Sequence, residues 1–331
     1  MKSKTLRRTA LILALVVILA LSPFIYSRLV WHRSVAATWF CWQLRASGRD
    51  SMPDGGEAWL AERASVNAGP VTPPTDLTCA IEQRSFSSAE GDMPYFVLNE
   101  QDSPSLLLVY FAGGTYIDPP SATHWYFIDE LAARTGAEVI VPVYPLLPEA
   151  DAEECLAVLR PFYTEIVTAM DCGTLAFGGD SAGGGLALST AQVLAAEGAD
   201  GPDRLLLISP WLDVSMENEE LSAYEAADPK LDRETLRFAG SLRAGDLDVT
   251  DPLVSPLYGD CSGLGDILLM AGTRELLYPD ILRFSALLDE QGVDHSLYIG
   301  EGMNHIWPLF AHYGLPEAAE ALDAAVAFLT A

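Results

Sequence analysis

The sequence predicts an α/β fold in which a mostly parallel, doubly wound central sheet is flanked by helices and carries a small helical cap. Short apolar runs alternate with helical stretches along most of the chain, the arrangement of parallel strands joined by crossover helices. Most of these runs are apolar at every position, as strands covered on both faces are. Half of the 331 residues are hydrophobic, enough for one large core rather than two small ones.

The first thirty residues differ in composition from the rest. Four basic residues among the first eight precede an uncharged stretch from Thr9 to Ser27. As a helix this stretch would be about 28 Å long, close to the hydrocarbon thickness of a bilayer. We expect residues 1–30 to form a transmembrane anchor; the alternatives are a cleaved signal peptide and a hydrophobic helix docked on the domain. With the basic flank in the cytoplasm, the rest of the chain would lie outside the cell membrane, or be secreted after cleavage.

Residues 31–76 are expected to form a juxtamembrane linker that contributes cap helices. Aromatic residues at positions 31, 39, 40 and 42 fall where an interfacial aromatic belt would lie, and Ala36 and Ala37 are the small residues at which a signal peptide would be cut. From about residue 48 the segment is rich in Gly, Pro, Ser and Asp, with one short helix expected over Glu57–Val66. A compact domain is expected to span residues 77–331.

The apolar runs of this domain predict seven buried strands, over Tyr95–Leu98, Leu106–Phe111, Glu138–Val143, Leu175–Phe177, Arg204–Ile208, Ile267–Ala271 and Ser296–Ile299. Helices are expected between them and at the C-terminus, over His124–Thr135, Ala152–Met170, Leu186–Glu197, Pro279–Gln291 and Pro316–Thr330. Residues 211–257 break the alternation and contain a helix over Asp232–Arg243 that starts with an Asp cap. This insertion is expected to be a lid; a solvated surface excursion is the alternative.

The most informative motif is a serine between glycines. Ser181 lies in a G-x-S-x-G pattern with Gly179 and Gly183, after the run Thr174–Phe177 and before the helix expected from Leu186. A strand, a glycine-flanked serine and a helix predict a nucleophile elbow, a strained turn that presents the serine hydroxyl at the edge of the sheet. A glycine-rich connection without chemistry is the alternative.

A serine nucleophile needs a base and a group that orients the base. Of the five histidines, His305 follows the last expected strand in a glycine-containing loop, where a catalytic base is placed in this architecture. The acid should fall between the serine and the histidine in the sequence, and the loop after Ile267–Ala271 offers Glu275 and Asp280. We favour Glu275, because Asp280 is placed where an acid stabilises the start of the next helix.

Acyl transfer also requires donors for the oxyanion. Ala182, directly after the serine, would supply one backbone N–H. The strand Leu106–Phe111 ends in a short loop in which the glycines Gly113 and Gly114 let N–H groups point into the site.

Composition limits the partners and cofactors. A net charge of −27, from 46 acidic and 19 basic residues, argues against a nucleic-acid partner and against an anionic membrane surface for the globular part. The five cysteines have no metal-ligand spacing, so no metal or organic cofactor is expected, and whether two of them pair stays open. The oligomeric state is not predicted either.

From residue 106 to the C-terminus the chain resembles the α/β-hydrolase superfamily, in particular the hormone-sensitive-lipase-like esterases that include bacterial acetyl esterases. The resemblance is carried by five stretches: GDSAGG around Ser181, LISPWLD at 207–213, DPLVSPL at 251–257, GTRELLYPD at 272–280 and EGMNH at 301–305. It implies Ser181 as nucleophile, Glu275 as acid and His305 as base.

The oxyanion loop of that family usually reads HGGG. Here Ala112 replaces the histidine and Thr115 the third glycine, and by position Gly114 and Thr115 would donate to the oxyanion. The resemblance implies a serine hydrolase of short- to medium-chain acyl esters that acts through an acyl-enzyme. The alternatives are an amidase, a peptidase or a glycan deacetylase with the same triad, or a weakened hydrolase fold that serves as an extracellular binding module.

Overall fold

The centre of the molecule is one sheet of eight strands in the order β1-β2-β4-β3-β5-β6-β7-β8. We analysed a computed structural model that describes residues 2–52 and 56–331. The first two pairings, β1 with β2 and β2 with β4, are antiparallel and the other five are parallel, so the predicted mostly parallel sheet is confirmed. The strands are β1 Ile81–Ser87, β2 Asp92–Leu98, β3 Leu106–Phe111, β4 Glu138–Pro142, β5 Thr174–Asp180, β6 Arg204–Ile208, β7 Asp266–Gly272 and β8 His295–Gly300.

The sequence missed strand β1. Its residues are mostly polar and its side chains are largely exposed, because it forms the edge of the sheet and pairs with β2 alone. Strands occur at all seven predicted places, and several are longer than expected. The last of them, β8, is not buried as expected, because it forms the other edge of the sheet and Gly300 is its one buried residue. Strand β5 runs on to Asp180, so that it ends directly before Ser181.

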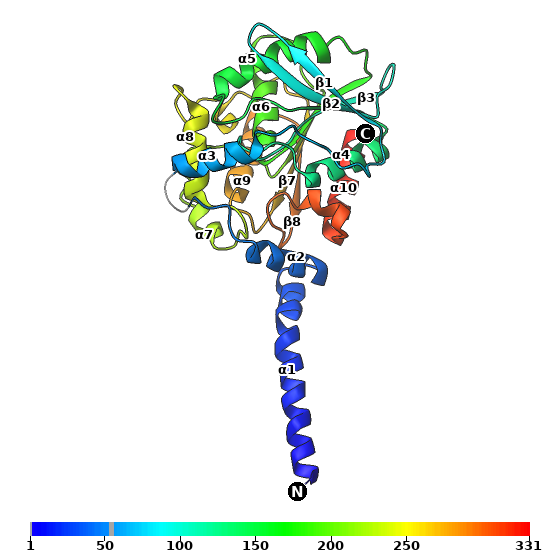
Figure 1. The fold of residues 1–331 in the computed structure, drawn as a ribbon, viewed down its shortest axis with the longest axis vertical. Helices are drawn as coiled ribbons and strands as arrows, with labels where there is room; N and C mark the ends of the chain where they lie inside the picture. Colours follow the sequence, from blue (N-terminus) through cyan, green and yellow to red (C-terminus); the bar gives the residue numbers. More distant parts are fainter. Residues whose placement is uncertain (1, 53–55) are drawn as a thin grey trace.

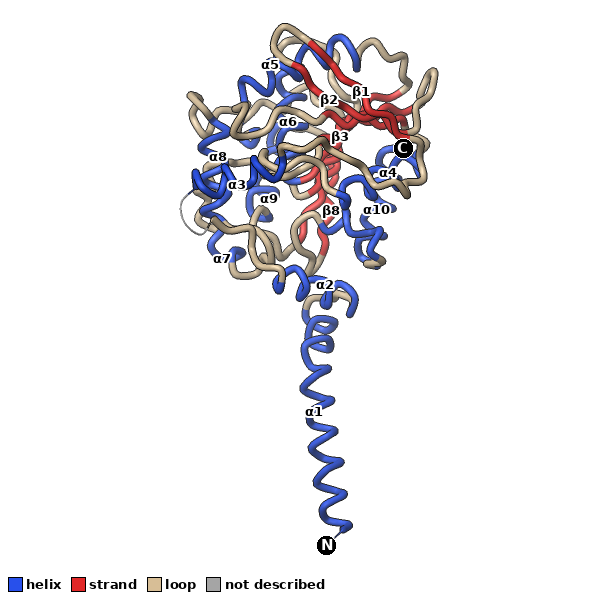
Figure 2. The backbone as a smooth tube through the Cα atoms, in the orientation of Figure 1, coloured by secondary structure: helices blue, strands red, loops and turns tan. Residues whose placement is uncertain are grey.

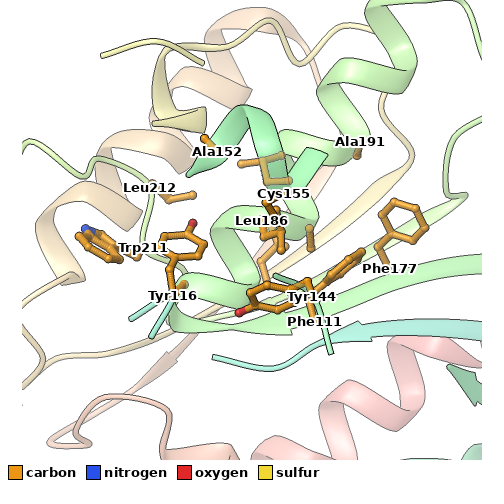
Figure 3. Close-up of a cluster of buried hydrophobic side chains, with 14 of the residues drawn as sticks. Phe111, Tyr116, Tyr144, Ala152, Cys155, Phe177, Leu186, Ala191, Trp211 and Leu212 are labelled. Carbon is orange, nitrogen blue, oxygen red and sulfur yellow. The ribbon is translucent and has the colours of Figure 1, made fainter. Parts of the chain in front are cut away.

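Helices cover both faces of the sheet (Figure 2). One face of the sheet is covered by α5 (Ala152–Phe162), α6 (Ser181–Ala196) and α9 (Tyr278–Gln291). The other face, formed by the alternate side chains of the same strands, is covered by α4 (Ala122–Thr135) and α10 (Pro316–Leu329). Figure 3 shows part of the first cluster, where the rings of Phe111 and Phe177 meet edge to face at 5.6 Å. Strands buried on both faces explain why their sequences are apolar throughout.

The helix expected over Ala152–Met170 is divided. It is an α-helix to Phe162 and then one π-helical turn, η1 (Tyr163–Val167), closed by a hydrogen bond of 3.0 Å from Thr168 N to Tyr163 O. Pro161 lies just before the change, and its missing N–H interrupts the regular helical hydrogen bonds.

The N-terminal part forms three helices. Helix α1 (Lys2–Val30) projects away from the domain, α2 (Val35–Ala46) lies at its base, and α3 (Gly56–Asn67) lies beside α8 on the flank of the domain (Figure 1). Residues 7–30 of α1 have a mean hydropathy of 2.5, and their most apolar 18 residues are not buried against the domain, so α1 is long and apolar enough to cross a membrane.

The insertion between β6 and β7 holds the remaining cap elements. It contains α7 (Leu221–Glu225), α8 (Arg233–Ala244) and the 3-10 turn η2 (Pro256–Tyr258), and a second 3-10 segment, η3 (Trp307–Tyr313), follows β8. The expected Asp cap is present, because Asp232 accepts a hydrogen bond from Thr235 N at 3.0 Å. All five cysteines lie in the described residues, and each is a free thiol.

Candidate active site

Ser181 is the first residue of α6 and has a backbone φ of 51°, in the left-handed region that side chains other than glycine rarely adopt. Its flanking glycines are required by close contact. A Cβ at Gly179 would lie 2.5 Å from the oxygen of Gly183, and a Cβ at Gly183 would lie 1.9 Å from the oxygen of Phe111. The strained turn between β5 and α6 therefore has the geometry of a nucleophile elbow.

His305 and Glu275 come from separate loops, and their side chains contact each other. His305 follows β8, Glu275 follows β7, and the distance from His305 Nδ1 to Glu275 Oε2 is 2.9 Å. The other oxygen of Glu275 accepts a hydrogen bond from Gly272 N at 3.0 Å, which fixes the carboxylate. With Nδ1 turned to the acid, Nε2 is the nitrogen that can serve the hydroxyl of Ser181, and Ser181 and His305 line one cavity.

Two opposing effects act on the pKa of His305. The ring is buried, which lowers its pKa, but the hydrogen bond and charge of Glu275 outweigh burial, and the net pKa is raised from the usual value of 6.5. The carboxylate of Glu275 stabilises the protonated ring of His305. A general base needs this stabilisation when it holds a proton between two steps of a reaction.

The alternative acid, Asp280, has different contacts. It is an early residue of α9, and its Oδ1 accepts a hydrogen bond from Asn218 Nδ2 at 2.7 Å. Burial raises the pKa of Asp280 to about 6. The carboxylate that contacts His305 is that of Glu275.

The loop after β3 is held against the elbow. Gly113 N donates to Asp180 Oδ1 at 3.1 Å, so this amide, which the sequence offers as an oxyanion donor, already has a partner. Gly114 has a φ of 148°, and a Cβ there would lie 2.2 Å from the oxygen of Asp118. Thr115 follows in the left-handed region with a φ of 59°. Three N–H groups are left for an oxyanion, those of Gly114, Thr115 and Ala182.

The sequence reasoning missed the carboxylate that holds this loop. Asp180 is fully buried, and it accepts hydrogen bonds from Gly113 N, from Tyr110 Oη at 2.9 Å and from His124 Nε2 at 3.2 Å. Burial raises the pKa of Asp180, but the charge and hydrogen bond of His124, followed by those of Gly113 and Tyr110, outweigh it, and the net pKa is lowered. Asp180 is therefore an anion that links β3, α4 and the elbow.

The orientation of His124 follows from its position at the start of α4. Its Nδ1 accepts a hydrogen bond from Ser121 N at 3.0 Å, in a capping box with Ser121 as the cap. Because Nδ1 is turned to Ser121 N, Nε2 is the nitrogen that faces Asp180 and donates to it. The S-x-x-H spacing was the available signal in the sequence, but its link to Asp180 spans 56 residues.

The cavity at Ser181 has a volume of about 140 Å³. Its floor is the oxyanion loop and the elbow, and its walls come from two sides: Trp59 and Arg63 of α3, and Leu231, Thr235 and Leu236 in and before α8. A larger open hollow of about 860 Å³ lies at the other end of the strands, where β5, β6 and β7 begin, away from Ser181 and His305.

Helix α3 is tied to the oxyanion loop. Arg63 forms an ion pair with Asp118, and Asn67 Nδ2 donates to Asp118 Oδ1 at 2.8 Å. At its other end α3 packs on α8, where Gly56 faces the ring of Phe238 so closely that a Cβ would lie 2.1 Å from it. The site is thus covered by two helices that are far apart in the sequence: α3 precedes strand β1, and α8 follows strand β6.

Comparison with known proteins places these features in a family. Residues 108–309 match the family described as the alpha/beta hydrolase fold. The chain is 31% identical over 235 residues to an acetyl-hydrolase of Streptomyces hygroscopicus, across 69% of this chain and 76% of that protein. It is 32% identical over 209 residues to a triacylglycerol lipase of Mycobacterium tuberculosis, across 63% of this chain and 43% of that protein. The chain therefore spans less than half the length of this second relative.

Solved structures agree on the fold. The crystal structure of an esterase from the bacterial hormone-sensitive lipase family superposes with a TM-score of 0.76, over 90% of this chain and 98% of that one. The two sequences are 24% identical, so this likeness concerns the fold.

Proposed function

Because the chain belongs to the alpha/beta hydrolase fold family, we propose that it is a carboxylic-ester hydrolase that uses Ser181 as its nucleophile. One observation carries the proposal: His305 is hydrogen-bonded to Glu275 at 2.9 Å and opens, together with Ser181, into one cavity. The esterase, acetyl-hydrolase and lipase names of its relatives support the same reaction class.

In the proposed reaction Ser181 Oγ attacks the ester carbonyl while His305 Nε2 takes the hydroxyl proton. Glu275 stabilises the imidazolium through Nδ1. The backbone N–H of Ala182, with those of Gly114 and Thr115, stabilises the oxyanion. His305 then returns the proton to the leaving alcohol, and water hydrolyses the acyl-enzyme by the same steps.

The size of the cavity supports small acyl groups. A volume of about 140 Å³ is comparable to that of an engineered cavity of about 150 Å³ that holds one benzene. We therefore propose short- to medium-chain acyl esters as substrates, with Trp59 and Leu236 among the apolar side chains beside the acyl group.

A fluorophosphonate probe tests the nucleophile. We expect the full chain to be labelled once per molecule, and Ser181→Ala to abolish both labelling and ester hydrolysis. Ser262→Ala is the matched control, because this serine is exposed in the loop before β7, at the end of the strands away from Ser181. A folded wild-type protein that is not labelled would argue for the binding-module alternative.

We also propose that α1 anchors the enzyme in a membrane with its catalytic domain outside the cytoplasm. The candidate span of 24 residues, Arg7–Val30, would be about 36 Å long as a helix, and its uncharged part, Thr9–Ser27, about 28 Å, enough to cross a bilayer. The contacts of α2 argue against cleavage near Ala37. Such a cut would remove Arg33 and Ser34, of which Arg33 Nη1 donates to Gly302 O at 2.9 Å and Ser34 Oγ to Glu317 Oε2 at 2.9 Å.

The anchor is tested by fractionation and by N-terminal sequencing of the mature protein. We expect the protein to stay in membranes on alkaline extraction and to keep residues 7–30. A soluble mature protein that begins near Thr38 would overturn the anchor.

A further inference from the structure

Positive charge is concentrated at the membrane end of an otherwise acidic protein. The first 49 residues contain eight of the 19 Lys and Arg residues and no Asp or Glu, although the whole chain carries 46 acidic residues. Four of the eight precede the apolar stretch and would lie on its cytoplasmic side, and the other four, Arg28, Arg33, Arg45 and Arg49, follow it on the side of the domain. Three guanidinium groups, from Arg33, Arg45 and Arg274, line one cavity of about 190 Å³ together with the indoles of Trp31 and Trp42. We call this the arginine cavity.

The three arginines have neutral partners. Arg33, with only 3% of its surface exposed, donates to Gly302 O at 2.9 Å and to Ser27 Oγ at 3.2 Å. Arg45 Nη2 donates to Ala227 O at 2.8 Å, and Arg274 lies over the ring of Trp31 at 4.1 Å. None of the three forms an ion pair with a carboxylate in residues 2–52 or 56–331.

Their charges therefore oppose one another in a partly buried site. Burial, followed by the positive charges of Arg33 and Arg45, lowers the pKa of Arg274. Arg33 is buried and Arg274 half-buried, whereas Arg45 is exposed at the rim of the cavity. Placing further positive charge beside a buried cation is unfavourable unless an anion compensates it. Guanidinium groups bind phosphate through paired hydrogen bonds, which makes a phosphate group the anion that suits the arginine cavity best.

The arginine cavity lies at the level where α1 would leave a bilayer. Trp31 directly follows the last residue of α1, and the ring of Trp42 packs on Phe24 of α1 at 5.0 Å. On α2, Trp39 is 55% and Trp42 39% exposed, as expected of aromatic side chains among lipid head groups.

We propose that the arginine cavity binds the phosphate of a membrane-lipid head group. This inference rests on the proposed anchor, which brings the cavity to the membrane surface. The phosphate would compensate Arg33, Arg45 and Arg274, and the indoles of Trp31 and Trp42 would contact the adjoining glycerol. Arg274 precedes Glu275 in sequence, so the bound lipid would lie directly behind the loop of the catalytic acid.

Native mass spectrometry of the full chain in a neutral detergent tests the proposal. The protein is offered an ether-linked phosphatidylglycerol, which it cannot hydrolyse, or the corresponding dialkylglycerol without phosphate. We expect one retained phosphatidylglycerol and no retained dialkylglycerol. The double variant Arg45→Gln/Arg274→Gln should bind the phospholipid at least about tenfold more weakly, since each cation near a lipid surface contributes on the order of 1 kcal/mol.

Arg84→Gln/Arg134→Gln is the matched control, because it removes two exposed or half-buried arginines on β1 and α4 and should leave lipid retention unchanged. Fluorophosphonate labelling reports whether each variant is folded, and the single variant Arg45→Gln, at an exposed side chain, is the second test if the double variant does not fold. Equal lipid retention by the arginine-cavity variant and the control, or equal retention of the phosphate-free lipid, would overturn the proposal.

Inorganic phosphate separates the two sources of this chemistry. We expect it to leave the lipid bound even in large excess; displacement at equal concentration would identify a soluble anion as the ligand and overturn the lipid assignment. Alkaline extraction tests α1 alone, so a failed anchor and a failed lipid site give different results.

Discussion

Replacement of His124 by alanine is expected to slow the reaction without touching the triad. The side chain donates from Nε2 to the buried Asp180, and Asp180 in turn holds Gly113 N in the oxyanion loop. His124→Ala leaves Asp180 with two donors instead of three. We therefore expect the loop between Ala112 and Thr115 to lose its fixed position against the elbow.

The size of the effect follows from the charge of the acceptor. A hydrogen bond to an ionised group contributes about 1.5–3 kcal/mol, and about 1.4 kcal/mol corresponds to a factor of ten in rate. We expect kcat to fall roughly 10- to 100-fold, less than the 100- to 1000-fold typical of a lost oxyanion donor. KM should change little, because His124 acts through the loop rather than on the ground-state ester.

Kinetics of p-nitrophenyl acetate hydrolysis, with active sites counted by a fluorophosphonate, measure this effect. His124→Gln keeps a neutral N–H donor and should recover part of the loss. His312→Ala is the control, since this exposed histidine stacks on Tyr126 away from the elbow. A His124→Ala enzyme with kcat within twofold of wild type, or with the whole defect in KM, would refute the reasoning.

Three other predictions concern the acid, the oxyanion loop and the cap. The raised pKa of His305 places the acid limb of kcat/KM above pH 6.5, because only the neutral ring accepts a proton. The variant Glu275→Gln should move this limb to lower pH and reduce kcat by roughly 1000- to 10,000-fold. A pH-rate profile in which the variant's acid limb lies at higher pH would contradict this prediction. Ala112→His restores the residue usual in related loops. It should lower the free energy of unfolding in urea by about 1–3 kcal/mol, because Ala112 is 2% exposed and packed in the core. A variant that is more stable and has a higher kcat would count against this prediction. Arg63→Ala breaks a half-exposed ion pair with Asp118 and should change the free energy of unfolding by less than about 1 kcal/mol. It should alter KM several-fold across esters of increasing acyl length. An unchanged dependence of KM on acyl length would show that α3 does not shape the cavity.

The sheet and the triad candidates could be predicted because both depend on local pattern and chain order. Strands buried on both faces are apolar at every position, and the loops after parallel strands meet at one edge of the sheet. Ser181, Glu275 and His305 each follow such a strand, so their sequence order was sufficient to nominate them.

The remaining features depend on contacts that no local pattern encodes. Strand β1 is polar because it forms an edge, and its pairing with β2 becomes visible only in the sheet. The role of His124 depends on α4 packing against an elbow 56 residues away, and Gly113 meets Asp180 across 67 residues. For α3 the sequence predicts a short helix and a contribution to the cap, but the contact of Trp59 and Arg63 with the cavity is visible only in the structure.

The construction of the cap from two separate segments has a consequence for how this enzyme can diversify. Trp59 and Arg63 come from a helix that precedes every strand of the sheet, and Leu236 from one inserted between β6 and β7. Neither helix supplies Ser181, Glu275 or His305, the proposed catalytic groups, so substitutions in either can alter which esters enter while those groups keep their places. Selection for new substrates can therefore act on two independent regions of the chain at little cost to catalysis.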